Sequence, residues 1–283
     1  MNYRHAFHAG NFADVFKHVL LTRILIYLAR KETPFRVIDT HAGEGGYDLQ
    51  SDEAIRGGEW RNGIGRLGDL TDADEAARDL IRPFLDIVGP LSVEGQPPAY
   101  PGSPSIIQAL MRLQDRATFC ELHPDSFGEL RARFRRDERI ACVHLDGYKG
   151  LSAGVPPKER RGLVLIDPPY ERANELDLAW AALSAAHAKW PTGIYALWYP
   201  VKDARTIASF VRQIAQGGVR RVLRLELAVD DVTPGGKLAR AGLILVNPPY
   251  VLDAEASVLL PMLARKLARS PRAGAMREWV AGE

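Results

Sequence analysis

The sequence predicts an α/β fold built on one mainly parallel sheet with helices on both faces. Short apolar runs alternate with helical patterns along the chain, and several of these runs end at an acidic residue. Such alternation is typical of a doubly wound sheet, and 46% apolar residues in a chain of 283 suffice for a large core. We expect a single domain over residues 1–283, interrupted by one insertion.

Composition excludes several classes of protein. The 37 Lys and Arg residues against 35 Asp and Glu leave a net charge of +2, so any surface that binds nucleic acid has to be local. Cys120 and Cys142 lie in apolar, strand-like runs, which indicates reduced core residues rather than a disulfide or a metal site. No apolar run approaches the roughly 20 residues that span a bilayer. We expect a soluble, cytoplasmic, monomeric protein that binds neither a metal nor a membrane.

The first eighteen residues hold an unusual density of aromatic and polar groups, among them Tyr3, His5, Lys17 and His18. From Asn11 onward, apolar residues recur at three- and four-residue spacing, which predicts a helix. Each histidine by itself is compatible with a frayed terminus that makes ordinary polar contacts. The cluster as a whole instead indicates a mobile arm over residues 1–18 that leads into the helix.

Residues 35–39 predict the first strand, and a glycine-containing loop follows over residues 40–47. Backbone amides in such a loop can approach a ligand closely. Counted from Gly43, a dinucleotide fingerprint requires a sixth-position glycine, where this sequence has Asp48. A phosphate-binding loop that ends in Gly-Lys-Ser/Thr is absent as well. The loop therefore matches neither of these nucleotide sites.

The alternation of strands and helices is interrupted between residues 48 and 100. Residues 71–88 predict a helix capped by Thr71 or Asp72, and glycines and prolines flank it. We interpret residues 52–98 as an inserted small helical subdomain, which either helps to grip a substrate or only decorates the sheet.

The next two strands end at acidic residues. Residues 117–124 predict a strand with Glu121 near its end, where a carboxylate can accept both hydroxyls of a ribose. Residues 140–145 predict a strand that ends at Asp146 and Gly147, placed to recognise an adenine. The arginines between residues 131 and 139 fit a solvated helix face better than phosphate contacts.

The strongest chemical signal is the apolar run of residues 163–166, which stops at Asp167-Pro168-Pro169-Tyr170. Four branched apolar residues indicate a buried parallel strand, and two prolines end it because they cannot donate to a sheet ladder. An acid, two carbonyls and a ring are thereby fixed where open α/β sheets bind ligands. An amine on a flat ring would donate to Asp167 and to the Pro168 carbonyl, while Tyr170 stacks on the ring. The alternative is a plain Pro-Pro turn with a surface tyrosine.

A second candidate motif, Asn-Pro-Pro-Tyr, occupies residues 247–250. Strands are predicted before it at residues 193–199, 221–229 and 241–246, and the last two lack a helical crossover, so they form a hairpin with an antiparallel terminal strand. Only 33 residues follow this second motif, whereas 113 follow the first and leave room for the remaining elements. We therefore assign the chemistry to Asp167.

With these elements in place, the sequence resembles the class I methyltransferases, whose sheet has seven strands and an antiparallel terminal strand. The motif at Asp167 is similar to the (D/N/S)PP(Y/F) motif of the amino-methyltransferases, and the loop after residue 39 is similar to their S-adenosylmethionine loop. Nearly the whole chain resembles the bacterial 23S ribosomal RNA large-subunit methyltransferase J family, which makes N6-methyladenine; Glu44 and Gly46 depart from its pattern. The matching stretches are residues 3–11, 39–43, 100–104, 121–124, 160–163, 167–170 and 193–200.

The resemblance implies an enzyme that transfers a methyl group from S-adenosylmethionine to the N6 amine of one adenine in 23S ribosomal RNA. It implies direct in-line transfer to a flipped base, with S-adenosylhomocysteine as product. The implied cofactor contacts are His18, His41, Gly43, Ser103, Glu121, Asp146, Gly147 and Asp167. The implied catalytic residues are Asp167, Pro168, Tyr170, Tyr3, His5 and Lys17.

The residues alone leave three alternatives open: a DNA adenine methyltransferase, a methylase of a protein amide side chain, and a non-catalytic RNA-docking protein of the same fold. No helix-turn-helix or other DNA-reading module stands out. The docking alternative predicts that Asp167 is dispensable.

Overall fold

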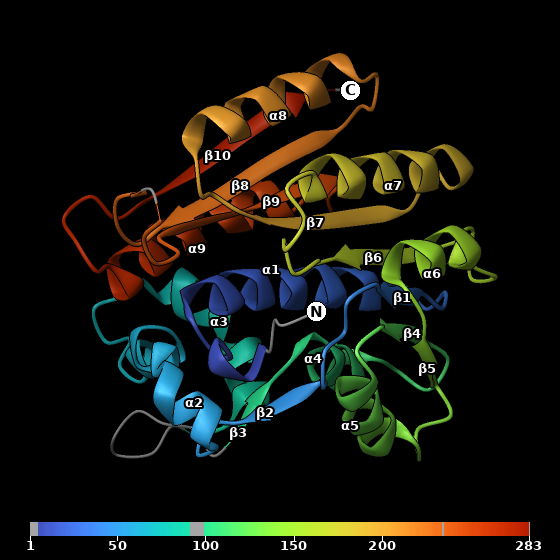
Figure 1. Ribbon diagram of the computed structural model, residues 1–283, viewed down its shortest axis with the longest axis horizontal. Helices are drawn as coiled ribbons and strands as arrows, with labels where there is room; N and C mark the ends of the chain where they lie inside the picture. Colours follow the sequence, from blue (N-terminus) through green and yellow to red (C-terminus); the bar gives the residue numbers. More distant parts are fainter. Residues whose placement is uncertain (1–4, 91–98, 234, 283) are drawn as a thin grey trace.

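The computed structural model describes residues 5–90, 99–233 and 235–282. An eight-stranded sheet with the order β10-β8-β9-β7-β6-β1-β4-β5 forms its centre (Figure 1). Strands β5, β4, β1, β6 and β7 are parallel, β9 is antiparallel to both β7 and β8, and β10 is antiparallel to β8. The strands of this sheet are β1 (Arg36–Asp39), β4 (Arg116–Glu121), β5 (Ile140–His144), β6 (Gly162–Ile166), β7 (Ile194–Pro200), β8 (Val222–Ala228), β9 (Arg240–Val246) and β10 (Gly274–Ala281).

Side chains that alternate along the strands divide the core into two layers. In β6, Leu163 and Leu165 pack on one face of the sheet, and Val164 and Ile166 pack on the other, as the two-residue period of a strand requires. Helices α1, α3, α4, α5 and α9 contribute to the first layer, and α6, α7 and α8 to the second (Figure 1). These helices are α1 (Phe12–Ala29), α3 (Glu75–Val88), α4 (Ser103–Leu110), α5 (Pro124–Phe134), α6 (Gly147–Gly154), α7 (Glu175–Lys189), α8 (Ala204–Gln216) and α9 (Leu252–Leu267).

Helix α1 is buried along most of its length, between the sheet and helices α3, α4 and α9. It begins at Asn11, whose side chain accepts hydrogen bonds from the first backbone amides of the helix. The inserted elements pack against it: α2 (Asp52–Gly57), η2 (Glu59–Asn62), η3 (Ile64–Leu67) and α3 place Trp60 and Phe84 in the same core as Phe16. The polar residues on α1 are therefore held in a rigid, apolar setting.

All seven predicted strands are present, and the structure adds elements that the sequence patterns did not indicate. Strand β10 lies at the edge of the sheet and is largely exposed, so it lacks the continuous apolar run of a central strand. A separate antiparallel pair joins β2 (Gly46–Asp48) to β3 (Ala99–Pro101). Helix α3 begins after Asp74, so the predicted caps Thr71 and Asp72 were wrong; the amide and hydroxyl of Thr71 donate to Asp69 in a turn instead.

The strand order reverses at β1, which lies between β4 and β6. Open α/β sheets bind ligands at such a switch point, beyond the carboxyl ends of the strands. In the register of the sheet, Asp39 is paired with Leu165, and the amide of Thr40 donates to the Leu165 carbonyl at 3.0 Å. The loop after β1 and the turn that begins at Asp167 therefore lie side by side.

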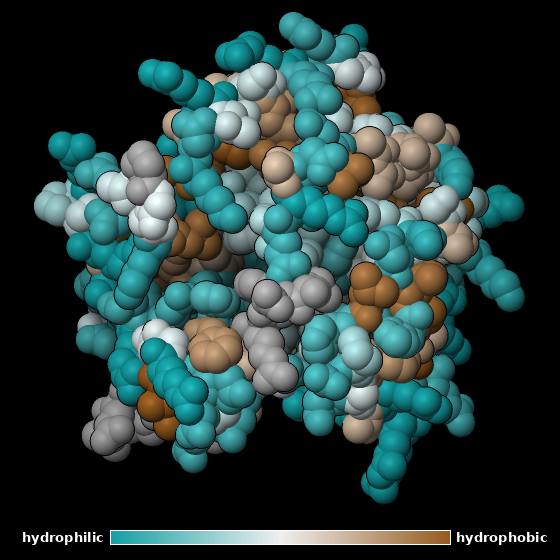
Figure 2. Space-filling view, viewed as in Figure 1, coloured by the Kyte–Doolittle hydropathy of each residue, from teal (hydrophilic) through white to brown (hydrophobic). Residues whose placement is uncertain are grey.

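The surface is mostly hydrophilic on the face shown in Figure 2, where hydrophobic groups appear in small, separate patches. Among the described residues, no helix is both long and apolar enough to cross a membrane.

Candidate active site

A cavity of about 760 Å³ lies at the carboxyl ends of β1, β4, β5, β6 and β7. This volume is typical of pockets that bury a small-molecule ligand. Tyr3 lies outside the described residues, but every other residue that the sequence analysis singled out for cofactor binding or catalysis lines this one cavity. They are His5, Lys17, His18, His41, Gly43, Ser103, Glu121, Asp146, Gly147, Asp167, Pro168 and Tyr170.

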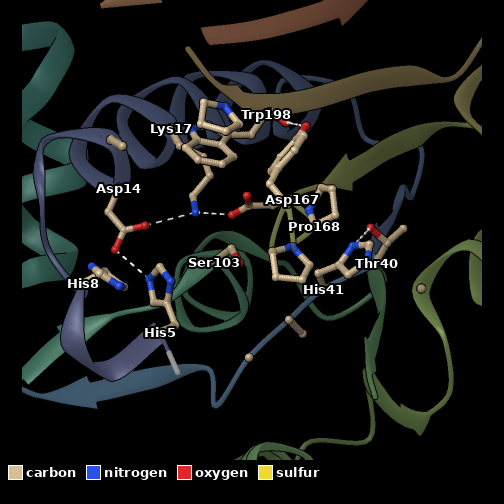
Figure 3. A pocket seen from close by; sticks show the side chains of 18 of the residues that line it. His5, His8, Asp14, Lys17, Thr40, His41, Ser103, Asp167, Pro168 and Trp198 are labelled. Carbon is tan, nitrogen blue, oxygen red and sulfur yellow. Dashed lines mark hydrogen bonds and ion pairs between the residues drawn. The ribbon is translucent and has the colours of Figure 1, made fainter. Parts of the chain in front are cut away.

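Asp167 meets a buried lysine from the first helix. The ammonium group of Lys17 donates to the Asp167 carboxylate and also lies 3.1 Å from Oδ1 of Asp14 (Figure 3). Burial opposes the charge on Lys17, but the two carboxylates outweigh it and raise the pKa of this lysine far above its usual value. Lys17 is therefore a permanent cation between two acids that lie 153 positions apart in the chain.

Tyr170 and Trp198 form an aromatic wall beside Asp167. Tyr170 has a left-handed backbone with φ of 53°, a conformation that side chains other than glycine seldom adopt. Its hydroxyl donates to the carbonyl of Trp198, and the two ring centroids are 5.6 Å apart at 63°. The indole of Trp198 also lies 5.9 Å from Nζ of Lys17. The wall is thus fixed to β7 and to the carboxylate cluster together.

His18 presents an unpaired polar atom. Its Nδ1 lies 2.8 Å from the hydroxyl of Tyr100, and burial raises the pKa of that phenol, so the hydroxyl stays protonated. Burial, together with Lys17, lowers the pKa of His18 well below its usual value, so the ring is neutral. Nε2 has no hydrogen-bond partner among the described residues. A buried polar nitrogen of this kind is costly unless a ligand satisfies it, which fits a polar group of a bound cofactor.

Backbone amides orient the two carboxylates at the ends of β4 and β5. Glu121 accepts from the amide of Gly43 at 2.8 Å and from that of His123 at 2.7 Å. Asp146 caps α6, where its Oδ1 accepts two amides of the first turn at 3.1 Å. Within the described chain, Oδ2 of Asp146 makes no hydrogen bond. The arrangement leaves acceptor capacity for the hydroxyl and amino donors of a nucleoside.

Two glycines allow the loops around these acids to approach each other. Gly43 has φ of +61°, and a Cβ there would lie 2.3 Å from the hydroxyl of Tyr47. A Cβ on Gly147 would lie 2.1 Å from the carbonyl oxygen of Thr40. A larger residue at either position would push apart the loops that surround the nucleoside end of the cavity.

Asp39 and His41 flank the end of β1. Asp39 is fully buried and accepts a 2.7 Å hydrogen bond from the hydroxyl of Ser103. Burial raises the pKa of Asp39 to about 7 despite that hydrogen bond. Burial lowers the pKa of His41 to about 4, and its Nδ1 lies 2.8 Å from the hydroxyl of Thr40. His41 is therefore neutral near pH 7.

The rim of the cavity combines an ion pair with exposed cations. Nδ1 of His8 lies 3.1 Å from Oε2 of Glu59, which the insertion contributes. The hydrogen bond to Glu59 raises the pKa of His8 against the effect of burial. Arg172, Lys202 and Lys237 also line the cavity and are exposed.

Asp14, Glu59 and Trp198 are among the residues of the cavity that the sequence analysis did not predict for the site. Asp14 stood in the crowded N-terminal stretch, but nothing in its spacing distinguished it from a solvated helix residue. Glu59 lies in the insertion, which gives no strand end from which to infer its position. Trp198 had an available signal, because it lies near the carboxyl end of the strand that pairs with β6.

The second Pro-Pro-Tyr motif lies away from the cavity. It follows β9, which is antiparallel to β7. The side-chain amide of Asn247 donates to the carbonyls of Pro191 and Gly193, just before β7 begins. Parallel strands start at that edge of the sheet and end at the other. The second motif therefore lies at the edge opposite to Asp167.

The strand order, the reversal at β1 and the acids at the carboxyl ends of four neighbouring strands define a class I methyltransferase fold and site. A family model described as "Ribosomal RNA large subunit methyltransferase D, RlmJ" matches residues 32–281, and the chain belongs to this RlmJ family of ribosomal RNA methyltransferases.

Two relatives, each named ribosomal RNA large subunit methyltransferase J, match the full length of the chain. The one from Escherichia coli K12 is 38% identical, the one from Haemophilus influenzae is 39% identical, and 100% of each chain is covered. The crystal structure of protein LPL1258 from Legionella pneumophila superposes with a TM-score of 0.86 at 32% identity, covering 96% of this chain and 98% of that one.

Proposed function

We propose that this protein transfers a methyl group from S-adenosylmethionine to the N6 amine of an adenine in 23S ribosomal RNA. One observation carries the proposal. In a chain of the RlmJ family, a carboxylate fixed by Lys17 lies beside the aromatic wall of Tyr170 and Trp198, within a cavity that Glu121 and Asp146 also line.

The amine of adenine is a poor nucleophile because its lone pair is delocalised into the ring. Hydrogen bonds from the amine to the free oxygen of Asp167 and to the Pro168 carbonyl localise that lone pair on nitrogen. Lys17 holds the other carboxylate oxygen, so Asp167 keeps one orientation. Flipping the base out of its stack costs a few kcal/mol, and stacking on Tyr170 returns roughly 1–3 kcal/mol.

The cofactor end of the cavity fits S-adenosylmethionine by its donors and acceptors. The unpaired Nε2 of His18 is available to a polar group of the cofactor, Glu121 accepts ribose hydroxyls, and Asp146 with Gly147 receives the adenine edge. When bound, the cofactor supplies an activated methyl group. Because the leaving group is already activated, the residues contribute mainly by positioning.

The amino-terminal residues close the site in this proposal. Described residues 5–11 lie against the cavity, and residues 12–18 already belong to α1. Contacts of His5 with a bound adenine would hold the described part of the arm over the site, and Tyr3, the other implied contact, lies outside the described residues. We further propose that the protein acts as a monomer, in the cytoplasm and without a metal.

The cations at the rim support an RNA substrate. Arg172, Lys202 and Lys237 come from three different loops, and no ion pair holds them within the described residues. Phosphates on either side of a flipped nucleotide would meet these side chains. The insertion helps to grip the substrate through Glu59 and its neighbours in this scheme.

The decisive experiment compares RNA from a deletion strain complemented with wild-type protein or with Asp167→Asn. Mass spectrometry of 23S RNA should show one N6-methyladenine with the wild type and its loss in the variant. Parallel assays with the purified protein on total RNA, on DNA of the same sequence and on protein test the enzyme alternatives. Full methylation by Asp167→Asn would remove Asp167 from the chemistry, whereas absence of methylation in both complemented strains would favour the docking alternative.

A further inference from the structure

Asp14 belongs neither to the motif at Asp167 nor to the implied cofactor contacts. It nevertheless lies between His5 and Lys17, the lysine that pairs with Asp167. It is 2% exposed, in the first turn of α1. Its Oδ2 accepts hydrogen bonds from Nε2 of His5 at 2.8 Å and from the amide of Gly10 at 3.0 Å. Its Oδ1 lies 3.1 Å from Nζ of Lys17 (Figure 3). Both carboxylate oxygens of Asp14 therefore have partners, and Oδ1 faces the lysine that pairs with Asp167.

Two carboxylates flank the single ammonium group of Lys17, and His5 lies on the far oxygen of Asp14. Burial raises the pKa of Asp14, but His5 and Lys17 outweigh it and hold the pKa well below its usual value. Asp14 and Asp167 thus place two negative charges around the single positive charge of Lys17. If Asp14 were neutral, the Lys17 ammonium would face the charge of Asp167 alone, and the site would be more positive by the one charge that Asp14 carries.

We propose that Asp14 is a positioning residue whose charge offsets Lys17, so that the site favours the cationic sulfonium of S-adenosylmethionine over the neutral thioether of S-adenosylhomocysteine. The inference rests on the proposed function. In the transfer, the amine nitrogen bonds to the methyl carbon as the carbon–sulfur bond breaks, and the bonding electron pair remains on sulfur. The surplus amine proton leaves through the Asp167 carboxylate to water.

The chemistry places the cation close to this cluster. The methyl group lies between sulfur and the amine in an in-line transfer, and the amine donates to Asp167, so the sulfonium approaches the carboxylates whatever the pose of the rest of the cofactor. The side chains of Asp14 and Lys17 are buried, and charges on buried groups are weakly screened. Product release benefits from the same arrangement, because the attraction disappears when the sulfur becomes neutral.

Isothermal titration of the full-length protein with each of the two ligands tests the proposal. Asp14→Asn keeps the shape of the side chain and removes its charge. We expect its affinity for S-adenosylmethionine to fall about tenfold or more, and that for S-adenosylhomocysteine to change by less than about threefold. Asp14→Asn combined with Lys17→Met removes both charges, and should return the ratio of the two affinities toward the wild-type value.

A matched control is Asp115→Asn, which neutralises another fully buried carboxylate, just before β4 at the opposite edge of the sheet. It should leave the ratio unchanged. Should Asp14→Asn fail to fold, Lys17→Met is tested instead. Its affinity for S-adenosylmethionine divided by that for S-adenosylhomocysteine should equal or exceed the wild-type value. Equal losses for both ligands in Asp14→Asn, or a ratio that the double variant fails to restore, would overturn the proposal. Binding of both ligands without RNA methylation would overturn the proposed function and leave the ratio test standing.

Discussion

The chain contains two Pro-Pro-Tyr turns, one at the cavity and one at the opposite edge of the sheet. Both follow a buried apolar strand, β6 in the first case and β9 in the second. β6 runs parallel to its neighbours, whereas β9 is antiparallel to β7 and β8. The direction of the strand decides which edge of the sheet receives the turn, and only one edge has the cavity.

The surroundings of the two turns differ in the same sense. Asp167 contacts Lys17, and Tyr170 donates its hydroxyl to Trp198. The side-chain amide of Asn247 instead donates to two backbone carbonyls, and Tyr250 is 75% exposed. The comparison teaches that a tetrapeptide acquires chemistry from the strand that presents it and from residues far away in sequence.

Exchanging the first residues of the two turns should have the largest effect. We expect Asp167→Asn to lower the single-turnover rate of methyl transfer at least about tenfold with little change in RNA binding, since an amide oxygen accepts less strongly than a carboxylate. Adding Asn247→Asp to this variant should restore nothing. Recovery of the rate in the double variant would break the comparison.

The tyrosines come next. Tyr170→Ala should reduce the rate severely because the ring face does the stacking, whereas Tyr250→Ala should leave the rate within about twofold. Tyr170→Phe keeps the ring and loses the hydrogen bond to Trp198, at a cost to unfolding free energy of about 1 kcal/mol. Equal rate losses in the Phe and Ala variants would show that the Tyr170 hydroxyl, and not its ring, supports methyl transfer.

His5 of the amino-terminal arm contacts Asp14, which pairs with Lys17 beside the turn at Asp167. Deleting residues 1–8 should remove most of the methyl-transfer activity, while the thermal midpoint falls by only a few degrees, since few apolar contacts are lost. Activity of the truncated protein on ribosomal RNA, measured beside its melting curve, checks this. A full rate would mean that the arm is only a frayed terminus.

The smallest effect is expected at the rim. The pKa of His8 is raised above its unfolded value by Glu59, so the stability that this pair contributes is present at low pH and is lost as pH rises through the folded pKa. The thermal midpoint at about pH 5.5, taken relative to that at about pH 8.5, should therefore be slightly higher in the wild type than in Glu59→Gln. An identical pH dependence in both proteins would show that the His8–Glu59 pair does not contribute to stability.

Much of the fold follows from the sequence because buried parallel strands are written as unbroken apolar runs with a sharp end. Residues 163–166 and the prolines after them needed no further context, and the count of residues after each turn was enough to choose between the two Pro-Pro-Tyr motifs. The exposed edge strand β10 has no such run, so local pattern did not indicate it.

The tertiary structure alone decided how the acids and bases of the site are paired. Asp14 and Lys17 are ordinary helix residues by spacing. The contact of Lys17 with Asp167 arises because α1 packs across the sheet near the end of β6. The same packing buries His18 and leaves one of its nitrogens unpaired. Residue type fixes which groups can ionise, whereas burial and the distance to the nearest opposite charge fix whether they do, and both of these depend on segments that are remote in the chain.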